Sequence, residues 1–397
     1  MYFLKKHAWL LLLSGLGAGC QTAMPDSSFG KDLEFLRKHQ SVLLLQAEDN
    51  PDAQVAVVGA WQGRVMTSTA TGAAGSGYGW INQSLISKGT YQPHINAYGG
   101  EDRFWLSPEG GQYSVFFEKG KDFTFDNWQT PPLIDTVAFE TVTQTAQSAS
   151  FRKRAMLENH SGTSFDIEIL RKIRVFSRKE NETWLGTTLP EGIRWVGYES
   201  ENTLVNHGAD WQKDTGLLGV WILGMFTPAP ATTIVAPYHN ELQLTDNYFG
   251  KVPDDRLRKG SGAVFLRADG KYRSKIGLTP GSTTGAAGSY DAARQVLTLV
   301  QFDVDAAGDY LKSTWEHHAE PYHGDAFNAY NDGPLADGSQ MGPFYELESS
   351  SSVKPLKKGG SLTHHHRTFH LEGSKETLDA ISRKVLGVSL AEIEKAF

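Results

Sequence analysis

The chain has 397 residues, 40% hydrophobic and 21% charged, so it can form a sizeable core and is not extensively disordered. The formal net charge is −7, with 38 Lys plus Arg against 45 Asp plus Glu, which argues against a nucleic-acid-binding protein. The 41 Gly, 10 Trp, 14 Tyr and 20 Phe favour a β-rich protein with many turns and with aromatic side chains suited to sugar binding.

The N-terminus predicts an exported protein. Lys5 and Lys6 precede an apolar run over residues 8–13, and small residues follow as far as Cys20. This order is typical of a signal peptide, here over residues 1–19, and its apolar run is too short to span a bilayer. Because it is the single cysteine of the chain, Cys20 also excludes an intramolecular disulfide and a cysteine-based zinc site.

The residues around the cysteine predict a lipid anchor. The string Gly17-Ala18-Gly19-Cys20 resembles a bacterial lipobox, which implies that Cys20 is lipidated and that residues 20–30 form a polar tether. By the same resemblance, Gln21 implies the bacterial cell envelope as the location, with the outer membrane, facing the periplasm, as the destination. The alternative is an ordinary secretory signal with an incidental cysteine.

The rest of the chain predicts one all-β domain over residues 31–373, a large antiparallel β-sandwich, flanked by short helices. One helix is expected over residues 29–46, and a second over residues 374–397, with Ser374 as its N-cap. Between them lie short segments rich in Val, Ile, Phe, Thr and Trp, separated by turn signals, which predict strands. These segments are 54–68, 112–118, 136–142, 150–157, 165–177, 217–225, 232–236, 262–267, 295–302 and 344–349.

Several catalytic signatures are absent from the sequence. There is no Walker A loop, no HExxH, no GxSxG and no strand-linked GxGxxG. Nucleotide hydrolysis, zinc-dependent proteolysis and serine-hydrolase chemistry therefore lose support. We expect no cofactor.

A first polar cluster begins at His94 and Asn96 and continues through two glycines, Gly99 and Gly100. It ends in two carboxylates, an arginine and a tryptophan. Carboxylates and arginine bind sugar hydroxyls through charge-assisted hydrogen bonds, and a tryptophan face covers the apolar side of a sugar ring. The alternative is that the arginine pairs with one of the two carboxylates and pins a turn. The four residues are Glu101, Asp102, Arg103 and Trp105.

A second cluster combines Tyr330, Asn331 and Asp332 with the strand that carries Glu346 and Glu348. Side chains two apart on a strand point to the same face, so the two glutamates are expected side by side. Such a pair raises each other's pKa, as general acid–base chemistry requires. The alternative is an ordinary solvent-facing pair.

Histidines form a third cluster near the C-terminus. On a strand, His364 and His366 share a face, and so do His366 and His370. Imidazoles beside a carboxylate can hold a divalent metal, but the spacing matches no specific metal motif. We therefore expect hydrogen-bonding or general-base histidines in a cleft, and no metal.

The order of these motifs resembles the galactose mutarotase-like proteins, the aldose 1-epimerase superfamily. The resemblance covers residues 53–373 and is carried by the strand over 55–70, by the Asn159-containing turn before the strand over 165–176, and by the strand end at Glu348. Taken together, residues 99–109, 206–225 and 330–348 resemble an uncharacterised family of bacterial lipoproteins with this fold more than a true mutarotase. The superfamily resemblance implies that Glu348 corresponds to the catalytic base of mutarotases. Asn206-His207-Gly208 and Asn159-His160-Ser161 each resemble part of the motif that carries their essential histidine.

These observations together predict a lipoprotein that recognises carbohydrate in a cleft on the concave sheet. Glu346 and Glu348 form the acidic wall, with His207 as a further catalytic candidate, and Asp102, Arg103 and Trp105 form a facing loop. The remaining binding candidates are His94, Asn96, Glu101, Trp211, Trp221, Tyr330, Asn331 and Asp332.

Two other functions stay open. The first is an enzyme using the glutamate pair in the same cleft, either a sugar epimerase or a polysaccharide-processing enzyme. The second is a structural or assembly lipoprotein of the envelope with a vestigial cleft.

Overall fold

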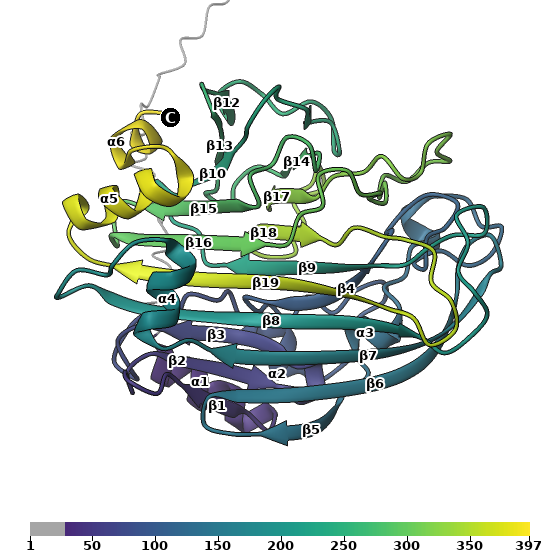
Figure 1. The fold of residues 1–397 in the computed structure, drawn as a ribbon, viewed down its shortest axis with the longest axis horizontal. Coiled ribbons are helices and arrows are strands. Elements are labelled where there is room, and N and C mark those ends of the chain that lie inside the picture. The colour runs from purple at the N-terminus through teal and green to yellow at the C-terminus, as the bar shows by residue number, and fades with distance from the viewer. Residues whose placement is uncertain (1–27) are drawn as a thin grey trace, which may run out of the picture.

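The computed structural model describes residues 28–397 as a β-sandwich with short helices at its margins (Figure 1). The signal peptide, the lipidated Cys20 and most of the tether predicted from the sequence lie outside the described residues. No helix over residues 28–397 combines the length and apolar character needed to cross a bilayer.

The larger layer is a ten-stranded antiparallel sheet. Its central strands, β7, β8 and β19, are the longest in the pairing scheme and hold the sheet together through continuous registers. In sheet order the strands are β12 (Leu257–Lys259), β13 (Ala263–Arg267), β10 (Thr233–Pro237), β15 (Ala286–Asp291), β16 (Val296–Phe302), β19 (Ser361–Glu372), β8 (Arg194–Asn206), β7 (Ser164–Val175), β6 (Ser148–Glu158) and β5 (Glu140–Gln144).

The opposing layer consists of a six-stranded sheet with a three-stranded sheet beside it. An isolated bridge between Val65 and Asp102 joins the margin of the three-stranded sheet to that of the six-stranded one. The six-stranded sheet has the order β11 (Leu244–Thr245), β14 (Ser274–Leu278), β17 (Phe327–Asn331), β18 (Tyr345–Ser350), β9 (Gly219–Phe226) and β4 (Arg103–Ser107), and the three-stranded sheet has the order β1 (Leu43–Gln46), β2 (Gln54–Val58) and β3 (Arg64–Thr69).

Buried and more exposed side chains alternate along the strands, and the buried ones form the core between the two layers. On β7, every second residue from Phe165 to Val175 is buried, and the residues between them are half-buried or exposed. On β18, Leu347 and Ser349 face the ten-stranded sheet, where the Ser349 hydroxyl lies 2.8 Å from ring nitrogens of both His364 and His366. The opposite face of β18 is therefore turned away from the ten-stranded sheet, and its side chains are buried as well.

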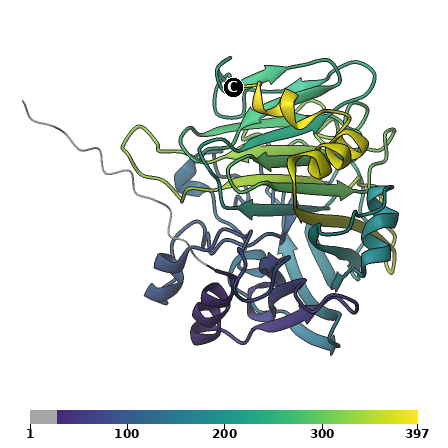
Figure 2. The same cartoon turned by 90° about the vertical axis from the view of Figure 1, so that its left-hand side faces the viewer.

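The N-terminal helix is shorter than the sequence predicts. It covers α1 (Phe29–His39), and Leu43–Gln46 forms strand β1 against β2 instead of continuing the helix. The extended conformation of Gln40 ends the helix, and the apolar run that follows is buried by pairing as a strand. Figure 2 shows these purple elements gathered at one end of the molecule, with the yellow C-terminal helices at the other.

Short helices cover the margins of the sandwich. Ser374 caps α5 as predicted, accepting a hydrogen bond from the Thr377 amide, but the expected C-terminal helix is broken by Gly387 into two. The segment 112–118, expected as a strand, is a loop, and Phe117 forms only an isolated bridge with Trp128. The helices after α1 are η1 (Gly59–Trp61), α2 (Gln83–Lys88), η2 (Phe125–Asn127), α3 (Pro132–Asp135), α4 (Arg178–Leu185), α5 (Lys375–Leu386) and α6 (Leu390–Glu394).

Candidate functional site

The outer face of the six-stranded sheet carries a charged and aromatic cluster that we call the Glu348 face. Because Leu347 and Ser349 point into the core, Glu346 and Glu348 both point to this face, as predicted from the period of two. The registers of β4, β9, β14 and β17 place further side chains in the same rows. The face comprises Arg103, Trp105, Trp221, Lys275, Tyr330, Glu346 and Glu348.

Glu348 is fully buried, and only one of its two carboxylate oxygens has hydrogen-bond partners among the described residues. Its Oε2 accepts hydrogen bonds from the indole Nε1 of Trp221 at 3.0 Å and from Nζ of Lys275 at 2.9 Å. Its Oε1 has no hydrogen-bond partner among the described residues. A buried carboxylate oxygen without a donor is costly, so this atom is poised to accept a hydrogen bond from a bound hydroxyl group.

Glu346 is held differently, by an ion pair with Arg103 from the other side of β9. The Arg103 guanidinium also lies 5.2 Å from the centre of the Trp105 ring. Burial raises the pKa of Glu346 to about 8, and the neighbouring Glu348 adds to this while Arg103 opposes it. Two carboxyl groups two residues apart therefore have different partners, one a lysine and an indole, the other an arginine.

The rim of the Glu348 face adds more titratable groups. Glu109 accepts a hydrogen bond from the indole of Trp315 at 3.2 Å, and burial raises its pKa while the nearby Lys275 lowers it. Burial also raises the pKa of Asp332, whose Oδ1 accepts a hydrogen bond from the Tyr330 hydroxyl. Burial thus shifts the pKa of both rim carboxyl groups upward.

The first polar cluster is split between two faces. Arg103 and Trp105 point to the Glu348 face, but Glu101 and Asp102 lie in the core, so the predicted facing loop is wrong for the two carboxylates. Asp102 forms an ion pair with Arg171, both side chains being inaccessible to solvent. Arg103 pairs with Glu346 and with neither of these carboxylates, so the alternative of an internal pair that pins a turn is also wrong.

Glu101 belongs to a separate network inside the sandwich. Its carboxylate accepts hydrogen bonds from the Ser68 hydroxyl at 2.8 Å and the Tyr198 hydroxyl at 3.0 Å, and its Oε2 lies 3.0 Å from the ring of His370. Side chains of the three-stranded and ten-stranded sheets thus meet at this carboxylate, which precedes β4 of the six-stranded sheet. Glu101 therefore stabilises the scaffold.

The C-terminal histidines share a face as predicted, but that face points into the core and not into a cleft. Burial lowers the pKa of His364 to about 3 and that of His366 to about 4, so both rings are neutral at physiological pH. In the part of the chain that the structure describes, no three His, Cys, Asp or Glu side chains are grouped to hold a metal ion.

The remaining sequence candidates lie away from the Glu348 face or point away from it. The His94 ring lies 2.6 Å from the Trp128 carbonyl, Asn96 donates to Asp135 and packs in a loop, and Asn331 pins the turn at Gly270. Trp211 is buried edge-to-face against Phe165. None of these contacts reaches Glu348.

His207 does not join Glu348 either. It lies 3.0 Å from Glu168, a residue on the outer face of the ten-stranded sheet, so the core of the sandwich separates it from the glutamate pair. His160, the competing histidine, contacts the Lys121 carbonyl at 2.8 Å. The histidine that a mutarotase-type mechanism needs is thus not supplied by either of the two motifs that suggested it.

Lys275, Glu109 and Arg273 are site residues that the sequence interpretation missed. Arg273 directly precedes β14 and Lys275 lies two residues further on, within this strand, which was not predicted. This alternate spacing of the two cations was the available signal, but it is short and lies in a charged, glycine-containing segment. Glu109 comes from a loop, and only the fold brings it near Lys275.

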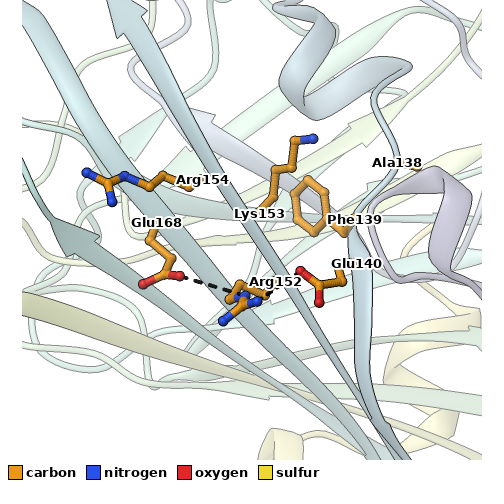
Figure 3. Close-up of a pocket in the computed structure, with 7 residues that line it drawn as sticks. All are labelled: Ala138, Phe139, Glu140, Arg152, Lys153, Arg154 and Glu168. Atoms are coloured by element: carbon orange, nitrogen blue, oxygen red, sulfur yellow. Dashed lines mark hydrogen bonds and ion pairs between the residues drawn. The ribbon is translucent and has the colours of Figure 1, made fainter.

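A hollow of about 570 Å³ lies elsewhere, at the β5–β7 margin (Figure 3). Its arginine at position 152 is paired with Glu140 at 3.0 Å and lies 3.9 Å from Glu168. A second hollow, of about 320 Å³, is lined by Trp61, Tyr91 and Tyr98 among others. The first hollow is lined by Ala138, Phe139, Glu140, Arg152, Lys153, Arg154 and Glu168.

Solved structures show which fold this is. A protein from Synechocystis sp. PCC 6803 aligns with 84% of this chain and 96% of its own, with a TM-score of 0.52 and 11% identity. A galactose mutarotase-like protein from Lactobacillus casei ATCC 334 aligns with 83% of this chain and 100% of its own, with a TM-score of 0.50 and 8% identity. The fold is therefore galactose mutarotase-like, as the sequence resemblance implied.

The sequence comparisons place the chain in a family. A comparison with curated proteins finds no match. The family model described as a family of unknown function, DUF6786, matches residues 27–397, which is nearly the whole chain. The chain belongs to this family, whose matched region includes the entire galactose mutarotase-like sandwich.

Proposed function

We propose that this protein is an exported lipoprotein that recognises carbohydrate on the Glu348 face. The observation that carries the proposal is the free Oε1 of Glu348, a fully buried carboxylate oxygen without a partner among the described residues. Sugar hydroxyls donate hydrogen bonds to carboxylates and accept them from lysine and arginine, and all three groups are present here.

The aromatic side chains of the face support the same function. Trp105 and Trp221 lie edge-to-face, with ring centres 5.6 Å apart, beside the two glutamates. Lys275 lies 4.8 Å above the Trp221 ring, which holds its ammonium group next to Glu348. Apolar rings beside fixed donors and acceptors are the composition that small polar ligands need in a site. The mutarotase-like fold is a further, weaker support.

A binding test with a matched control separates recognition from stability. Glu348→Gln removes the charge, and we expect it to weaken the binding of a glycan selected on an array by roughly tenfold to a hundredfold. Glu199→Gln is the control, because Glu199 is a buried carboxylate paired with Arg367 on the other sheet. Both variants lose stability, by about 3 kcal/mol where a buried pair is broken, so folding is checked by circular dichroism before binding is measured.

Loss of glycan binding in Glu348→Gln alone supports the proposal. Equal loss in both variants indicates a general effect of stability, and unchanged binding in Glu348→Gln moves the site elsewhere. If no glycan on the array binds the wild-type protein, the structural or assembly role in the envelope is favoured.

The membrane part of the proposal rests on Lys5, Lys6, the apolar run over residues 8–13 and Cys20. A lipid at Cys20 anchors the protein in the cell envelope, at the outer membrane on its periplasmic side. Metabolic labelling with a fatty-acid analogue tests this: the wild-type chain is expected to be labelled and Cys20→Ala is not. Equal labelling of both chains contradicts the lipid anchor.

A second function, an epimerase or polysaccharide-processing enzyme, is favoured by one observation. Burial raises the pKa of Glu346 to about 8 while Arg103 opposes this shift, so Glu346 takes up a proton more readily than an ordinary carboxyl group, and a carboxyl pair of this kind suits acid and base roles. Turnover of array-selected sugars, followed by NMR, tests this function. Turnover that persists in both Glu346→Gln and Glu348→Gln contradicts it.

A further inference from the structure

Arg273 borders the Glu348 face and differs from its other cations. It precedes β14 and lies two residues before Lys275, so both side chains emerge on the same side of the strand. Its guanidinium lies 3.8 Å from the centre of the Phe249 ring, and this ring is 48% exposed. Phe249 in turn meets the Tyr330 ring edge-to-face at 5.9 Å. A cation is therefore fixed on an accessible aromatic surface beside the site.

The other two cations of the face already have carboxylate partners. Arg103 pairs with Glu346, and Lys275 pairs with Glu348. No carboxylate over residues 28–397 lies within 4.0 Å of the Arg273 guanidinium, and its Nε is buried without a hydrogen-bond partner. Arg273 thus has no ion-pair partner among the described residues.

The charges of Arg273 and Glu348 both act on Glu109. Arg273 lowers the pKa of Glu109 against the effect of burial. Lys275 lowers this pKa as well, and Glu348 raises it. Arg273 likewise lowers the pKa of the Tyr330 hydroxyl, which burial and Asp332 raise well above its ordinary value. The Arg273 guanidinium and the Glu348 carboxylate are therefore both close enough to Glu109 to influence its ionisation.

The hollow of Figure 3 offers a contrast. Its two arginines are neutralised by acidic neighbours: Arg152 pairs with Glu140, and Arg154 forms two hydrogen bonds with Asp166, at 2.7 and 2.9 Å. The two arginines of this hollow thus have acidic partners, whereas Arg273 has no carboxylate of the described residues within 4.0 Å.

We infer that the sugar bound on the Glu348 face carries an anionic substituent, and that Arg273 binds this group while a hydroxyl of the same ligand reaches Glu348. A guanidinium matches a carboxylate or a sulfate through two parallel hydrogen bonds, and its stack on Phe249 holds it in place beforehand. The ligand class is thus a uronic acid or a sulfated sugar. This inference rests on the proposed function.

The experiment compares three matched disaccharides by calorimetry: a neutral one, its uronic acid counterpart and its sulfated counterpart. The wild-type protein is expected to bind at least one acidic form roughly tenfold to a hundredfold more tightly than the neutral form. Arg273→Gln is expected to remove this preference, whereas Arg273→Lys retains part of it. Which acidic form is preferred identifies the substituent.

Arg267→Gln is the matched control. Arg267 also stacks on an aromatic ring, that of Phe397 at 4.7 Å, and also has a buried Nε without a partner, but it lies on β13 of the other sheet. This variant is expected to keep the acidic preference. Circular dichroism confirms that each variant folds, and Arg273→Lys preserves the test if Arg273→Gln is unstable.

The outcomes separate this inference from the proposed function. Equal binding of neutral and acidic forms by the wild-type protein overturns the inference and leaves carbohydrate recognition standing. An acidic preference that survives in folded Arg273→Gln, or one that is lost equally in Arg267→Gln, also overturns it. If the wild-type protein binds none of the three sugars and no glycan on the array, the proposed function is contradicted, and the inference that rests on it is contradicted with it.

Discussion

Single side chains on β18 decide which groups can meet a ligand. Glu346 and Glu348 point outward because Leu347 and Ser349 occupy the core, and each carboxyl has its own cationic partner. At neutral pH this leaves one carboxyl group that readily holds a proton and one that has an oxygen free to accept a hydrogen bond. The asymmetry arises from the partners and not from the spacing of the glutamates.

Glu346 predicts a specific dependence of stability on pH. Its pKa is about 8 in the folded protein, mainly because of burial, against 4.5 for an unperturbed glutamate. A raised folded pKa contributes stability that is full below pH 4.5 and is lost as the pH rises to about 8. The free energy of unfolding of the wild-type protein, relative to Glu346→Gln, is therefore expected to fall across this window, by up to about 1.4 kcal/mol per pH unit.

Urea unfolding at several pH values measures this difference. Glu392→Gln is the control with the opposite sign, because the Ser389 hydroxyl lowers the pKa of Glu392, so its contribution is lost as the pH falls. A difference between wild type and Glu346→Gln that stays constant from pH 4.5 to 8 contradicts the account of this carboxyl group.

At the level of elements, the loop before β4 links the small sheet to the rest. Gly99 and Gly100 have φ angles of +96° and +112°, a backbone conformation that glycine adopts readily and other residues rarely do. A Cβ atom at Gly100 would lie 2.8 Å from the Val65 carbonyl oxygen and from the Arg64 side chain. The glycines thus serve the scaffold, and they allow β3 to approach the strand that carries Arg103.

Gly100→Ala is therefore expected to destabilise the fold more than Gly89→Ala. Gly89 also has a positive φ, +62°, but nothing lies within 4 Å of its added Cβ. Gly89→Ala costs about 1–2 kcal/mol of backbone strain, and Gly100→Ala costs roughly 1–3 kcal/mol more because of the clash. Denaturant unfolding measures the difference in the free energy of unfolding between the two variants. An equal decrease in both would show that the close approach to β3 does not contribute to stability.

The strands of the sequence prediction correspond well to the structure where the chain alternates or is uniformly apolar. The segments that became β6, β7, β9, β10, β13, β16 and β18 were recognised, and Glu346 and Glu348 were placed on one face. Strand β8 (Arg194–Asn206) was missed because Glu199, Glu201 and Asn202 interrupt its apolar pattern. Their partners, including Arg171 for Asn202, come from neighbouring strands and could not be foreseen from local sequence.

The site was predicted in part for the same reason. Glu346 and Glu348 could be assigned to a shared face of their strand, but adjacent residues at a strand start were not separated. Asp102 and Arg103 were expected together and lie on opposite faces. Contacts between distant segments, such as Lys275 with Glu348, depend on sheet order, which composition and periodicity do not contain.

At the scale of the whole molecule, the two sheets are joined by polar contacts as well as by apolar packing. The Ser349 hydroxyl of one sheet lies 2.8 Å from His364 and from His366 of the other. Both rings are inaccessible to solvent and must stay neutral, because a charge there would be buried between the layers. The sandwich is thus sensitive to acid.

His366 predicts the direction of this sensitivity. Burial lowers its folded pKa to about 4 from 6.5, so its contribution to stability is lost as the pH falls from 6.5 to about 4. His366→Gln is expected to reduce this acid loss by up to about 1.4 kcal/mol per pH unit. His365→Gln is not, because Asp303 raises the pKa of His365 and its contribution changes only above pH 6.5. Identical acid unfolding of the two variants would contradict this assignment.

The central claim is that a sugar binds on the Glu348 face, and a crystal structure with the tightest array-selected glycan tests it most directly. We predict a sugar hydroxyl about 2.5–3.0 Å from Oε1 of Glu348, with Lys275 and Trp221 still bound to Oε2. A glycan bound instead in the hollow between Glu140 and Glu168, with Oε1 of Glu348 left without a ligand contact, would contradict the account.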